Sequence, residues 1–535
     1  MSDQFPPAPW DLAFERFREL DAWWSGNTVE LNDIYSHRRA THTVGGRQYS
    51  GGVVGTLTKW FLGQPIDPDE KRMIMHVPFA ADICTLSSDL LFAEEPNVFF
   101  RNPDKTPDPA KEYTHPAQDR LEQIIGTDEA HAELMLGGEF GAALGGTYWA
   151  VAWDPAVADH VFPKAYAADL AIPEFRYGRL ASVKLWTEYH DGNQVFRLIE
   201  EHQPGTIEYT LFKGTAKTLG SPVPIGSRPE TAHYEQLRNP SDVLVSIDGP
   251  GKLPESVKIG TGSSRLAVTY MANARPVIDW RKQGQLAHLG RSDLDGNQDL
   301  LDKLDQTWSS MMRDMENGQG RLVVPEHFLD VGSKPGDGAS FDTYRQVFAG
   351  VNTLGGSGQT SDSQITVAQF AIRVEEHFKI IEEVSRTIAS RAGYSAAHLG
   401  LDATRGLKTA TQVQADLSDS ERTRDKKALF ARAALARWSV AALEIDKAVF
   451  GGPELGDMSR LPDVEFAPVS QADPEKTART LQMLDAARAA SRKEIVRALH
   501  PEWTEREIQD EADLIMREQG YGAPDPATFT GDDEV

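Results

Sequence analysis

The chain has 535 residues, of which 40% are hydrophobic and 9% aromatic, and its acidic residues outnumber the basic ones 80 to 55. This length predicts about three or four domains with ample apolar material for their cores, and the aromatic content excludes a largely disordered chain. The formal charge of −25 excludes a protein that coats DNA or anionic membranes over its whole surface. The single cysteine, Cys84, excludes a disulfide framework within the chain and a cysteine-based zinc site.

Two further features of the sequence bear on where the chain resides. No apolar run approaches the roughly 18–20 residues that a helix needs to cross a bilayer. The first residues, MSDQFPPAPW, lack the basic and apolar regions of a signal peptide. We therefore expect a soluble chain that is made in a reducing cytoplasm and has no membrane partner.

The first regular element that the sequence predicts is a short amphipathic helix over Pro9–Gly26. Its large apolar residues recur at steps of three and four and so share one face. So much aromatic surface on a terminal helix indicates docking, either onto its own domain or onto a neighbouring subunit. The residues of this face are Trp10, Phe14, Phe17, Leu20 and Trp24.

Residues from about 70 to 290 have the pattern of an α+β region with much antiparallel sheet. Met73–Pro78 is predicted to be a strand and Ala80–Phe92 a helix. Asp191-Gly192-Asn193 predicts a hairpin turn, and the small residues of Gly137–Gly146 favour a helix packed closely against a sheet over a phosphate-binding loop. Further strands are predicted over Thr147–Trp153, Ser182–His190, Gln194–Glu201, Ile207–Lys213 and Leu266–Met271.

From about residue 292 the pattern becomes helical. Apolar residues at helical spacing predict helices over Asp299–Asn317 and Ala368–Ala392, and a long stretch without Gly or Pro predicts a third over about Thr409–Phe450. A strand over Arg321–Pro325 and a Gly-, Ser- and Asp-rich insertion lie between the first two helices. The remaining expectations are a short strand at Glu465-Phe466, at least two helices within Pro474–Gln519, and a disordered acidic tail over Tyr521–Val535.

Motifs of the common enzyme classes are missing from the sequence. It contains no P-loop, HExxH or GxSxG pattern and no GxGxxG after a predicted strand. The densest histidines, His37, His42, His76 and His115, have no ligand spacing. We therefore expect no catalytic residue, no metal, no cofactor and no enzymatic activity.

One acidic segment has some features of a calcium loop. Asp293, Asp295, Asn297 and Asp299 alternate as calcium ligands do, but the glycine falls two positions early and Leu304 stands where the bidentate glutamate belongs. A helix start rich in Asp, which the helix dipole favours, explains these residues better.

The order of the parts carries a family resemblance. A helix, the strand RLVVP, a small α/β insertion and a second helix are followed by the loop HLGLDATRGLKTA and the long helix. The segment SRKEIVRALHPEWTEREIQDEADLI then gives a helix start, a His-Pro-aromatic break and an acidic helix, and ADICTLSSDLLFAEEP in the N-terminal half reads as an early helix before a Pro-containing turn. In this order, rather than in a single motif, the chain resembles the portal proteins of tailed bacteriophages, specifically the siphophage-type family.

The resemblance implies an α+β, portal-like subunit. Its parts would be an α/β wing, two antiparallel stem helices, a small α/β clip, a tunnel loop, a long wing helix and a helical crown. The implied boundaries are 1–290 for the N-terminal part of the wing, 291–317 for the first stem helix, 318–366 for the clip, 367–395 for the second stem helix, 396–408 for the tunnel loop, 409–472 for the long helix and C-terminal part of the wing, 473–520 for the crown and 521–535 for the tail.

The resemblance also implies a task. Portal subunits form a ring, expected to be a homododecamer, at one vertex of the capsid in the virion. Genomic DNA is packaged through this ring by the terminase and later ejected, and the head–tail adaptor attaches to it. The implied partners are further copies of the chain, double-stranded DNA in transient and non-specific contact, the terminase large subunit, the adaptor, and the major capsid and scaffolding proteins.

The residues themselves fit a passive channel. Lysines and arginines around a lumen would hold the duplex through phosphate contacts, whereas an acidic lumen lets it slide. The missing ATP-binding motif fits a conduit whose driving force comes from a separate ATPase. Acidity that only aids solubility explains the composition equally well.

Two groups of basic residues stand out in this acidic chain. In the implied tunnel loop, the candidate DNA-facing residues are Arg405, Gly406, Leu407 and Lys408, whose cations either touch phosphates intermittently or pair with a neighbouring subunit. The loop glycines would allow unusual backbone angles and movement. The second group alternates with acidic residues, so we expect a solvated helix face with opposite-charge pairs. It comprises Arg422, Arg424, Lys426, Lys427 and Arg432.

The stem and the clip supply the remaining candidate residues. Each stem helix carries one apolar stripe, which an isolated subunit would expose, and this argues for obligate assembly. The expected interface residues are Trp308, Met311, Met315, Phe370 and Phe378. The clip, which would bind the terminase and the adaptor, offers Phe341, Tyr344, Arg345 and Phe348.

Two other functions compete with a portal. The first is a capsid-associated or adaptor protein that oligomerises without conducting DNA, and an axial hole in the ring would distinguish the two. The second is a β-rich hydrolase that uses two of the many carboxylates. The long helix pair around an insertion counts against the hydrolase, and a screen for turnover would test it.

Overall fold

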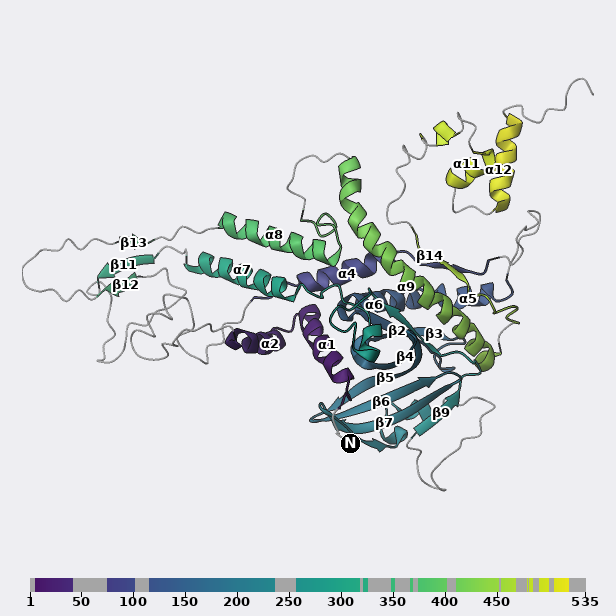
Figure 1. Cartoon of the computed structure of the whole chain (residues 1–535), viewed down its shortest axis with the longest axis horizontal. Helices are drawn as coiled ribbons and strands as arrows, with labels where there is room; N and C mark the ends of the chain where they lie inside the picture. Colours follow the sequence, from purple (N-terminus) through teal and green to yellow (C-terminus); the bar gives the residue numbers. More distant parts are fainter. Residues whose placement is uncertain are drawn as a thin grey trace, which may run out of the picture. The chain divides into compact units, whose positions relative to one another are not determined.

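The computed structural model describes residues 5–41, 75–101, 115–235, 256–317, 321–325, 348–351, 366–368, 374–401, 410–451, 454–467, 479, 481–484, 490–499 and 505–518. The chain divides into two compact units, Met1–Ala467 and Pro468–Val535. Helices and antiparallel sheets both occur in the first unit (Figure 1), which confirms the α+β class. In the part of the chain that is described, no helix is both long and apolar enough to span a membrane.

The N-terminal helices pack onto the body of the first unit. Helix α1 (Trp10–Ser25) ends at Gly26, whose φ of 67° closes the helix in the left-handed conformation. Its apolar face is buried with α4 (Phe79–Phe92) and the start of α7 (Gln298–Asn317) in one core. Docking onto its own domain, the first of the two alternatives, is therefore confirmed. Helix α2 (Thr28–Thr41) follows directly.

The largest sheet is antiparallel and has six strands in the order β4-β5-β6-β7-β8, with β9 also paired to β7. The expected hairpin joins β5 to β6, where Asp191 pairs with Gln194 and Gly192 has a φ of 59°. A turn with this positive φ favours glycine, so Gly192 by itself was enough to predict the hairpin from the local sequence. The strands are β4 (Ala171–Arg176), β5 (Arg179–Asp191), β6 (Gln194–Gln203), β7 (Thr206–Thr215), β8 (Thr218–Val223) and β9 (Ser256–Gly260).

A second antiparallel sheet has the order β10-β2-β3, formed by Val268–Ala272, Gly146–Ala152 and Phe162–Ala167. Helix α6 (Asp128–Leu144) lies against it, and a Cβ on Gly137 would come within 2.3 Å of Trp149 Nε1. Only glycine allows so close an approach, which confirms the expected helix packed tightly on a sheet. Short helical elements complete this region: α5 (Gln118–Ile125), η1 (Ala168–Leu170), η2 (Ile225–Ser227), η3 (Ala232–Glu235) and η4 (Gly284–His288).

Helix α9 (Ala410–Phe450) runs through the body of the first unit (Figure 1) and begins one residue after the predicted start. The indole N–H of Trp438 donates to the carbonyl of Ala150, 3.2 Å away, and anchors the helix on β2. Beyond α9, β14 (Asp463–Glu465) pairs with β1 (Asn97–Phe99), so the chain returns to its N-terminal half.

Helices α7 and α8 (Val374–Ala392) lie side by side (Figure 1). Arg391 near the end of α8 donates to the carbonyl of Gly296 at 2.9 Å, and His377 near its start lies 3.0 Å from Asp314 near the end of α7. The two helices are therefore antiparallel, as expected.

Three short strands lie between α7 and α8 in the sequence. Strand β11 (Arg321–Pro325) pairs in parallel with β12 (Phe348–Val351) and antiparallel with β13 (Thr366–Ala368). The prediction that a helix covers residues 368–392 was wrong at its start, because Val367 and Ala368 pair with β11 and the helix begins only at Val374. The expected strand over Met73–Pro78 was also wrong, since residues 75–77 form no strand.

The second unit contains α11 (Arg492–Leu499) and α12 (Glu505–Glu518), which agrees with the expectation of at least two helices there. Val496, Ile508 and Ala512 form a small buried cluster between them.

Candidate functional site

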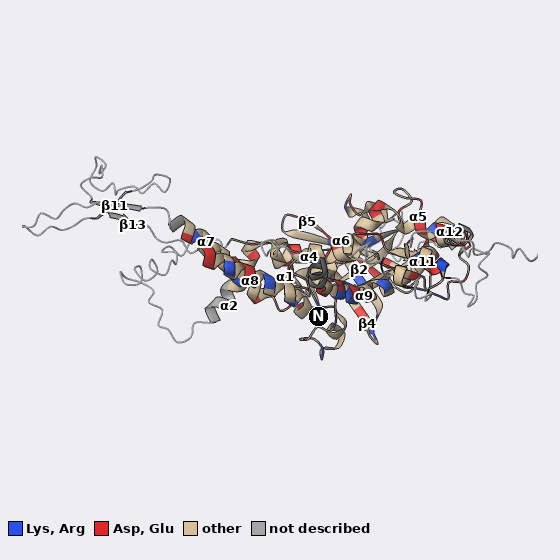
Figure 2. Cartoon of the chain, turned by 90° about the horizontal axis from the view of Figure 1, so that it is seen from above, with Lys and Arg blue, Asp and Glu red and all other residues tan. Residues whose placement is uncertain are grey.

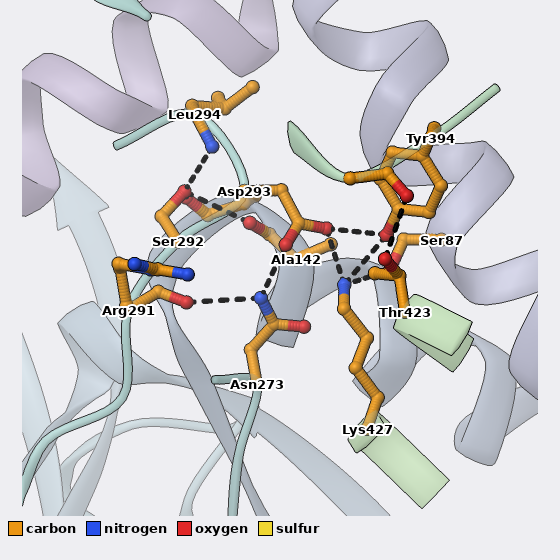
Figure 3. A network of polar contacts seen from close by, with 12 residues as sticks. Ser87, Ala142, Asn273, Arg291, Ser292, Asp293, Leu294, Tyr394, Thr423 and Lys427 are labelled. Carbon is orange, nitrogen blue, oxygen red and sulfur yellow. Dashed lines mark hydrogen bonds and ion pairs between the residues drawn. The ribbon is translucent and has the colours of Figure 1, made fainter. Parts of the chain in front are cut away.

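The most elaborate polar arrangement in the described part of the chain lies where α7 begins, α8 ends and α9 passes both (Figure 3). The ammonium group of Lys427 on α9 lies 2.5 Å from Asp293 Oδ2, 2.6 Å from Ser87 Oγ of α4 and 2.8 Å from the Tyr394 hydroxyl. These contacts use all three N–H groups of the lysine. We call Lys427, Asp293, Tyr394, Ser87 and Asn273 the junction.

The other partners of Asp293 complete the junction. The Tyr394 hydroxyl donates to Asp293 Oδ2 at 2.8 Å, and the side-chain amide of Asn273 donates to Oδ1 at 2.8 Å. The same amide also donates to the carbonyl of Arg291, at 3.0 Å. The junction therefore joins β10, the segment before α7, the segment after α8, and helices α4 and α9.

Burial makes this ion pair sensitive to the loss of either partner. The side chains of Lys427 and Asp293 are only 6% and 5% exposed. Burial lowers the pKa of Lys427, and the charge of Asp293 opposes that shift; burial likewise raises the pKa of Tyr394 well above its usual value. A buried charge that keeps its partner and its hydrogen bonds is tolerated, whereas one that loses them is strongly destabilising.

The segment after α8 is fastened to α9 at two further points. Gly393, with a φ of 92°, accepts at its carbonyl a hydrogen bond of 2.7 Å from the Thr423 hydroxyl. One turn away, Ser420 Oγ accepts from the backbone N–H of Ser395 at 2.8 Å and lies 2.9 Å from His398 Nδ1. These contacts hold the beginning of the expected tunnel loop, residues 396–401, against α9.

The acidic segment before α7 has structural partners. Arg16 on α1 makes a two-nitrogen contact with Asp295 Oδ1, at 2.6 and 2.9 Å, and Asp293 belongs to the junction. Asp299 lies in the first turn of α7, where the helix dipole favours an acid. Among the described residues, no group of three or more His, Cys, Asp or Glu side chains is placed to hold a metal ion.

The expected interface residues on α7 and α8 divide into two groups. Met315 is 46% exposed and Phe378 52% exposed, and the neighbouring Ile380 is 50% exposed. Met311 is only 2% exposed, so the expectation that an isolated subunit exposes it was wrong: it is covered within its own subunit. Trp308 is half-buried, and Phe370 lies outside the described residues.

Most of the other candidates also lie outside the described residues. These are Arg405, Gly406, Leu407 and Lys408 of the expected tunnel loop, and Phe341, Tyr344 and Arg345 of the expected clip. Phe348 is the first residue of β12.

The prediction that the basic group at 422–432 forms a solvated helix face was partly wrong. Arg422 pairs with Asp419 at 3.3 Å on an exposed face, as expected. Arg424 and Lys427 are instead buried, and Arg424 donates to the backbone carbonyls of Leu90 and Ala467. Both lie on the face of α9 that also buries Ala428 and Ala431. The helical spacing from these alanines was the sequence signal that could have predicted that Arg424 and Lys427 are buried.

Acidic residues are spread along the α7–α8 pair (Figure 2). On α8 the residues Glu375, Glu376 and Glu383 are solvent-exposed. The outer surface of the pair thus combines exposed carboxylates with the exposed apolar residues Met315 and Phe378.

Comparison with known proteins finds one family that matches part of the chain. Residues 269–523 match the family described as phage portal protein, SPP1 Gp6-like. No curated protein matches the chain. The matched range contains β10, α7, α8 and α9 with most of the junction, as well as the helices of the second unit.

Solved structures give weaker likenesses. The chain is similar to a chain of the virion of a native gene transfer agent (GTA) particle, with 12% identity, a TM-score of 0.35, and coverage of 87% of this chain and 98% of that one. It is also similar to a chain of the neck of an empty GTA particle computed with C6 symmetry, with 12% identity, a TM-score of 0.38, and coverage of 86% and 96%. At these TM-scores the family assignment depends on the sequence match.

The matched family is one of structural proteins of phage particles. The expected resemblance to phage portal proteins is confirmed by the match over residues 269–523.

Proposed function

We propose that this chain is the portal subunit of a phage or phage-like particle. Copies of it form a ring at one capsid vertex, the terminase packages genomic DNA through the ring, and DNA later leaves by the same route. The observation that carries the proposal is the antiparallel α7–α8 pair, which flanks a small sheet and joins the long helix α9 inside the range that matches the portal family.

Ring assembly is supported by unsatisfied apolar surface. Met315, Phe378 and Ile380 are about half exposed on the outer part of the α7–α8 pair. Several exposed large apolar residues on one pair of helices favour a contact with another molecule. A neighbouring copy in a ring covers them by symmetry, and we take the ring to be a homododecamer.

The remaining parts of the proposed portal take the boundaries inferred from the sequence. The wing comprises 1–290 and 409–472, the stem 291–317 and 367–395, the clip 318–366, the tunnel loop 396–408 and the crown 473–520. The β11–β12–β13 sheet belongs to the proposed clip, to which we assign terminase and adaptor binding. The major capsid and scaffolding proteins are the proposed partners of the assembled ring.

In this proposal the portal subunit contacts DNA only weakly. Exposed acids such as Glu375 and Glu376 on α8 repel phosphates, while Arg405 and Lys408 of the tunnel loop touch the backbone intermittently. Each added phosphate contact would steepen the salt dependence of binding and slow the passage of DNA. Deleting residues 403–408 should leave rings intact but impair packaging or DNA retention, and normally filled particles from this deletion would contradict the assigned role of the loop.

Imaging of the purified full chain with mass determination on the same sample tests the proposal. We expect rings with an axial hole wide enough for a duplex and a mass near that of a dodecamer. Closed rings without a hole would instead favour the non-conducting capsid or adaptor protein. A compact dimer with hydrolase turnover would contradict both structural functions.

A further inference from the structure

A pocket of about 300 Å³ lies on the first unit, and none of its lining residues belongs to the junction, to α7 or to α8. Its walls come from the β4–β5 hairpin, from β10 with residues on either side of it, and from α9. Part of the wall is apolar, formed by Phe175, Leu180, Leu266, Val268 and Phe430. Nothing in the proposed passage of DNA uses this pocket.

Four arginines line the pocket: Arg179, Arg265, Arg275 and Arg437. Arg265 is paired with Glu444 at 3.0 Å, and Arg275 donates to the carbonyl of His288 at 2.5 Å. The side chains of Arg179 and Arg437 are solvent-exposed and make neither an ion pair nor a hydrogen bond with the described residues. Three of the four arginines therefore lack a carboxylate partner, which is unexpected in a chain with a formal charge of −25.

The two free arginines also lie near each other. The pKa of Arg437 is lowered, first by burial and then by the positive charge of Arg179. Both side chains are solvent-exposed, so water and salt weaken the repulsion between them, and an anion bound between the two guanidinium groups pairs with both. A further polar group at the pocket is unpaired: Thr269 is only 7% exposed, and its hydroxyl has no hydrogen-bond partner within the described structure.

The hairpin that carries Arg179 presents an aromatic residue at its tip. Tyr177 and Gly178 form the two-residue turn between β4 and β5, with φ values of 49° and 75°. Such a turn favours Asn or Gly at both positions, because a side chain with a Cβ is strained in the left-handed conformation. Tyr177 is nevertheless fully exposed. A strained, solvated tyrosine beside an arginine-lined pocket indicates a contact with another molecule, since tyrosine and arginine are enriched at interface centres.

We propose that this pocket, together with Tyr177, is the docking site for an acidic segment of the neighbouring copy of the chain in the ring. The carboxylates of that segment pair with Arg179 and Arg437, and an apolar residue beside them fills the wall around Phe175 and Phe430. The inference rests on the ring assembly proposed above. Each subunit would offer the pocket to one neighbour and an acidic segment to the other, which is a head-to-tail contact of the kind that closes a ring.

Charge and size favour this occupant over DNA. A neighbouring copy supplies carboxylates in abundance, since the chain has 80 acidic residues. A duplex is too wide to enter a pocket of about 300 Å³ and would place only phosphates at its mouth, leaving the apolar wall uncovered. An acidic peptide with an apolar side chain meets both parts of the pocket.

Charge reversal at the mouth of the pocket tests the proposal. Arg437→Glu places a carboxylate beside Arg179, so the subunit should unfold at the same or a higher denaturant concentration. Assembly should weaken, with the concentration that gives half-maximal ring formation raised by about tenfold or more. Arg437→Lys should assemble nearly normally, as should Lys217→Glu, which reverses an exposed charge outside the pocket.

Tyr177→Asn is a second and independent test. Asparagine suits the left-handed turn better than tyrosine, so the stability of the subunit should stay equal or rise while assembly weakens. Unchanged ring formation by both Arg437→Glu and Tyr177→Asn would overturn the docking site. If the wild-type chain forms no rings at all, the proposed function fails first, and the two failures are thereby distinguished.

The occupant can be identified directly. A photoreactive amino acid in place of Tyr177 in assembled rings should crosslink to an acidic peptide of a second copy, which mass spectrometry locates. A crosslink to DNA, or only to residues of the same chain, would contradict the proposed occupant.

Discussion

The two ends of the α7–α8 pair meet their surroundings in opposite ways. At the base, Leu301, Leu304 and Ile388 are at most 1% exposed, and the junction satisfies every donor of Lys427. Farther out, Met315 and Phe378 are about half exposed. The base is thus complete within one subunit, whereas the outer part exposes apolar side chains that we propose a neighbouring copy covers. In this proposal the same pair of helices serves folding at one end and assembly at the other.

The largest effect is expected from breaking the junction. Lys427→Ala leaves the buried carboxylate of Asp293 without its counter-charge, which should lower the free energy of unfolding by about 3–5 kcal/mol. Urea unfolding of the purified subunit measures this loss. Lys426→Ala removes an exposed lysine next to it and should change stability little. An equal loss in the two variants would show that the junction does not hold the base together.

A smaller effect is expected from the turn after α8. A Cβ on Gly393 would lie 2.5 Å from Thr423 Oγ1 in a backbone conformation with a φ of 92°. Gly393→Ala should therefore destabilise the subunit by about 2–3 kcal/mol, because both the backbone and the contact with α9 are strained. Gly400→Ala is the matched control, since Gly400 has a φ of 72° but nothing within 4 Å of the added Cβ. Its loss should be nearer 1 kcal/mol, about the backbone term alone.

Two acidic residues of the first unit, Asp293 and Asp169, differ in whether their carboxylates have hydrogen-bond partners. Asp293 is fully partnered, but Asp169 Oδ1 is buried and has no partner in the described structure. Burial, with a smaller contribution from Asp21, raises the pKa of Asp169 to about 6. Between the unfolded pKa of 3.8 and the folded pKa of about 6, the folded state keeps a proton that the unfolded state has released. The contribution of Asp169 to stability is therefore greatest below the unfolded pKa and is lost as the pH rises through about 6.

Asp169→Asn removes that titration. At pH 7 the variant should be more stable than the wild type by about 1–3 kcal/mol. Well below the unfolded pKa of 3.8, where the wild-type carboxyl is protonated in both states, the difference should vanish. Urea unfolding of both proteins across this range is the measurement, and a difference that does not change with pH would contradict the assignment.

The smallest effect on stability is expected at the outer part of the pair. Phe378→Ser should change the free energy of unfolding by no more than about 0.5 kcal/mol, because about half of the side chain is exposed to solvent in the subunit. Ring formation should nevertheless weaken, as mass measurements over a range of concentrations would reveal. Lys379→Ser, at the adjacent exposed position, serves as the control. A large loss of subunit stability in Phe378→Ser would mean that this residue belongs to the core.

Local patterns predicted the elements better than their contacts. The long helix was expected from Thr409 and begins at Ala410, since its unbroken helical sequence is a local property. The expected helix over 368–392 failed at its start because Val367 and Ala368 also suit a strand, and pairing with β11 decides between the two. That partner strand is distant in the sequence, so local spacing carries no signal for it.

The junction was beyond prediction for the same reason. Lys427 lies among alternating charges, which is the pattern of a solvated face, yet its partner Asp293 is 134 residues away. The apolar stripe of α7 was identified correctly, but a stripe does not distinguish burial within a subunit from burial between subunits. Met311 proved to be covered within the subunit and Met315 to be exposed.

Hydrogen–deuterium exchange on assembled rings and on dissociated subunits shows whether a neighbouring subunit covers the outer part of the α7–α8 pair. Amides at the base, in residues 298–305 and 385–392, should be equally protected in both states. Amides in the outer segments, 311–317 and 374–381, should gain protection only in the ring. Equal exchange of the outer segments in the two states would contradict the claim that a neighbouring subunit completes them.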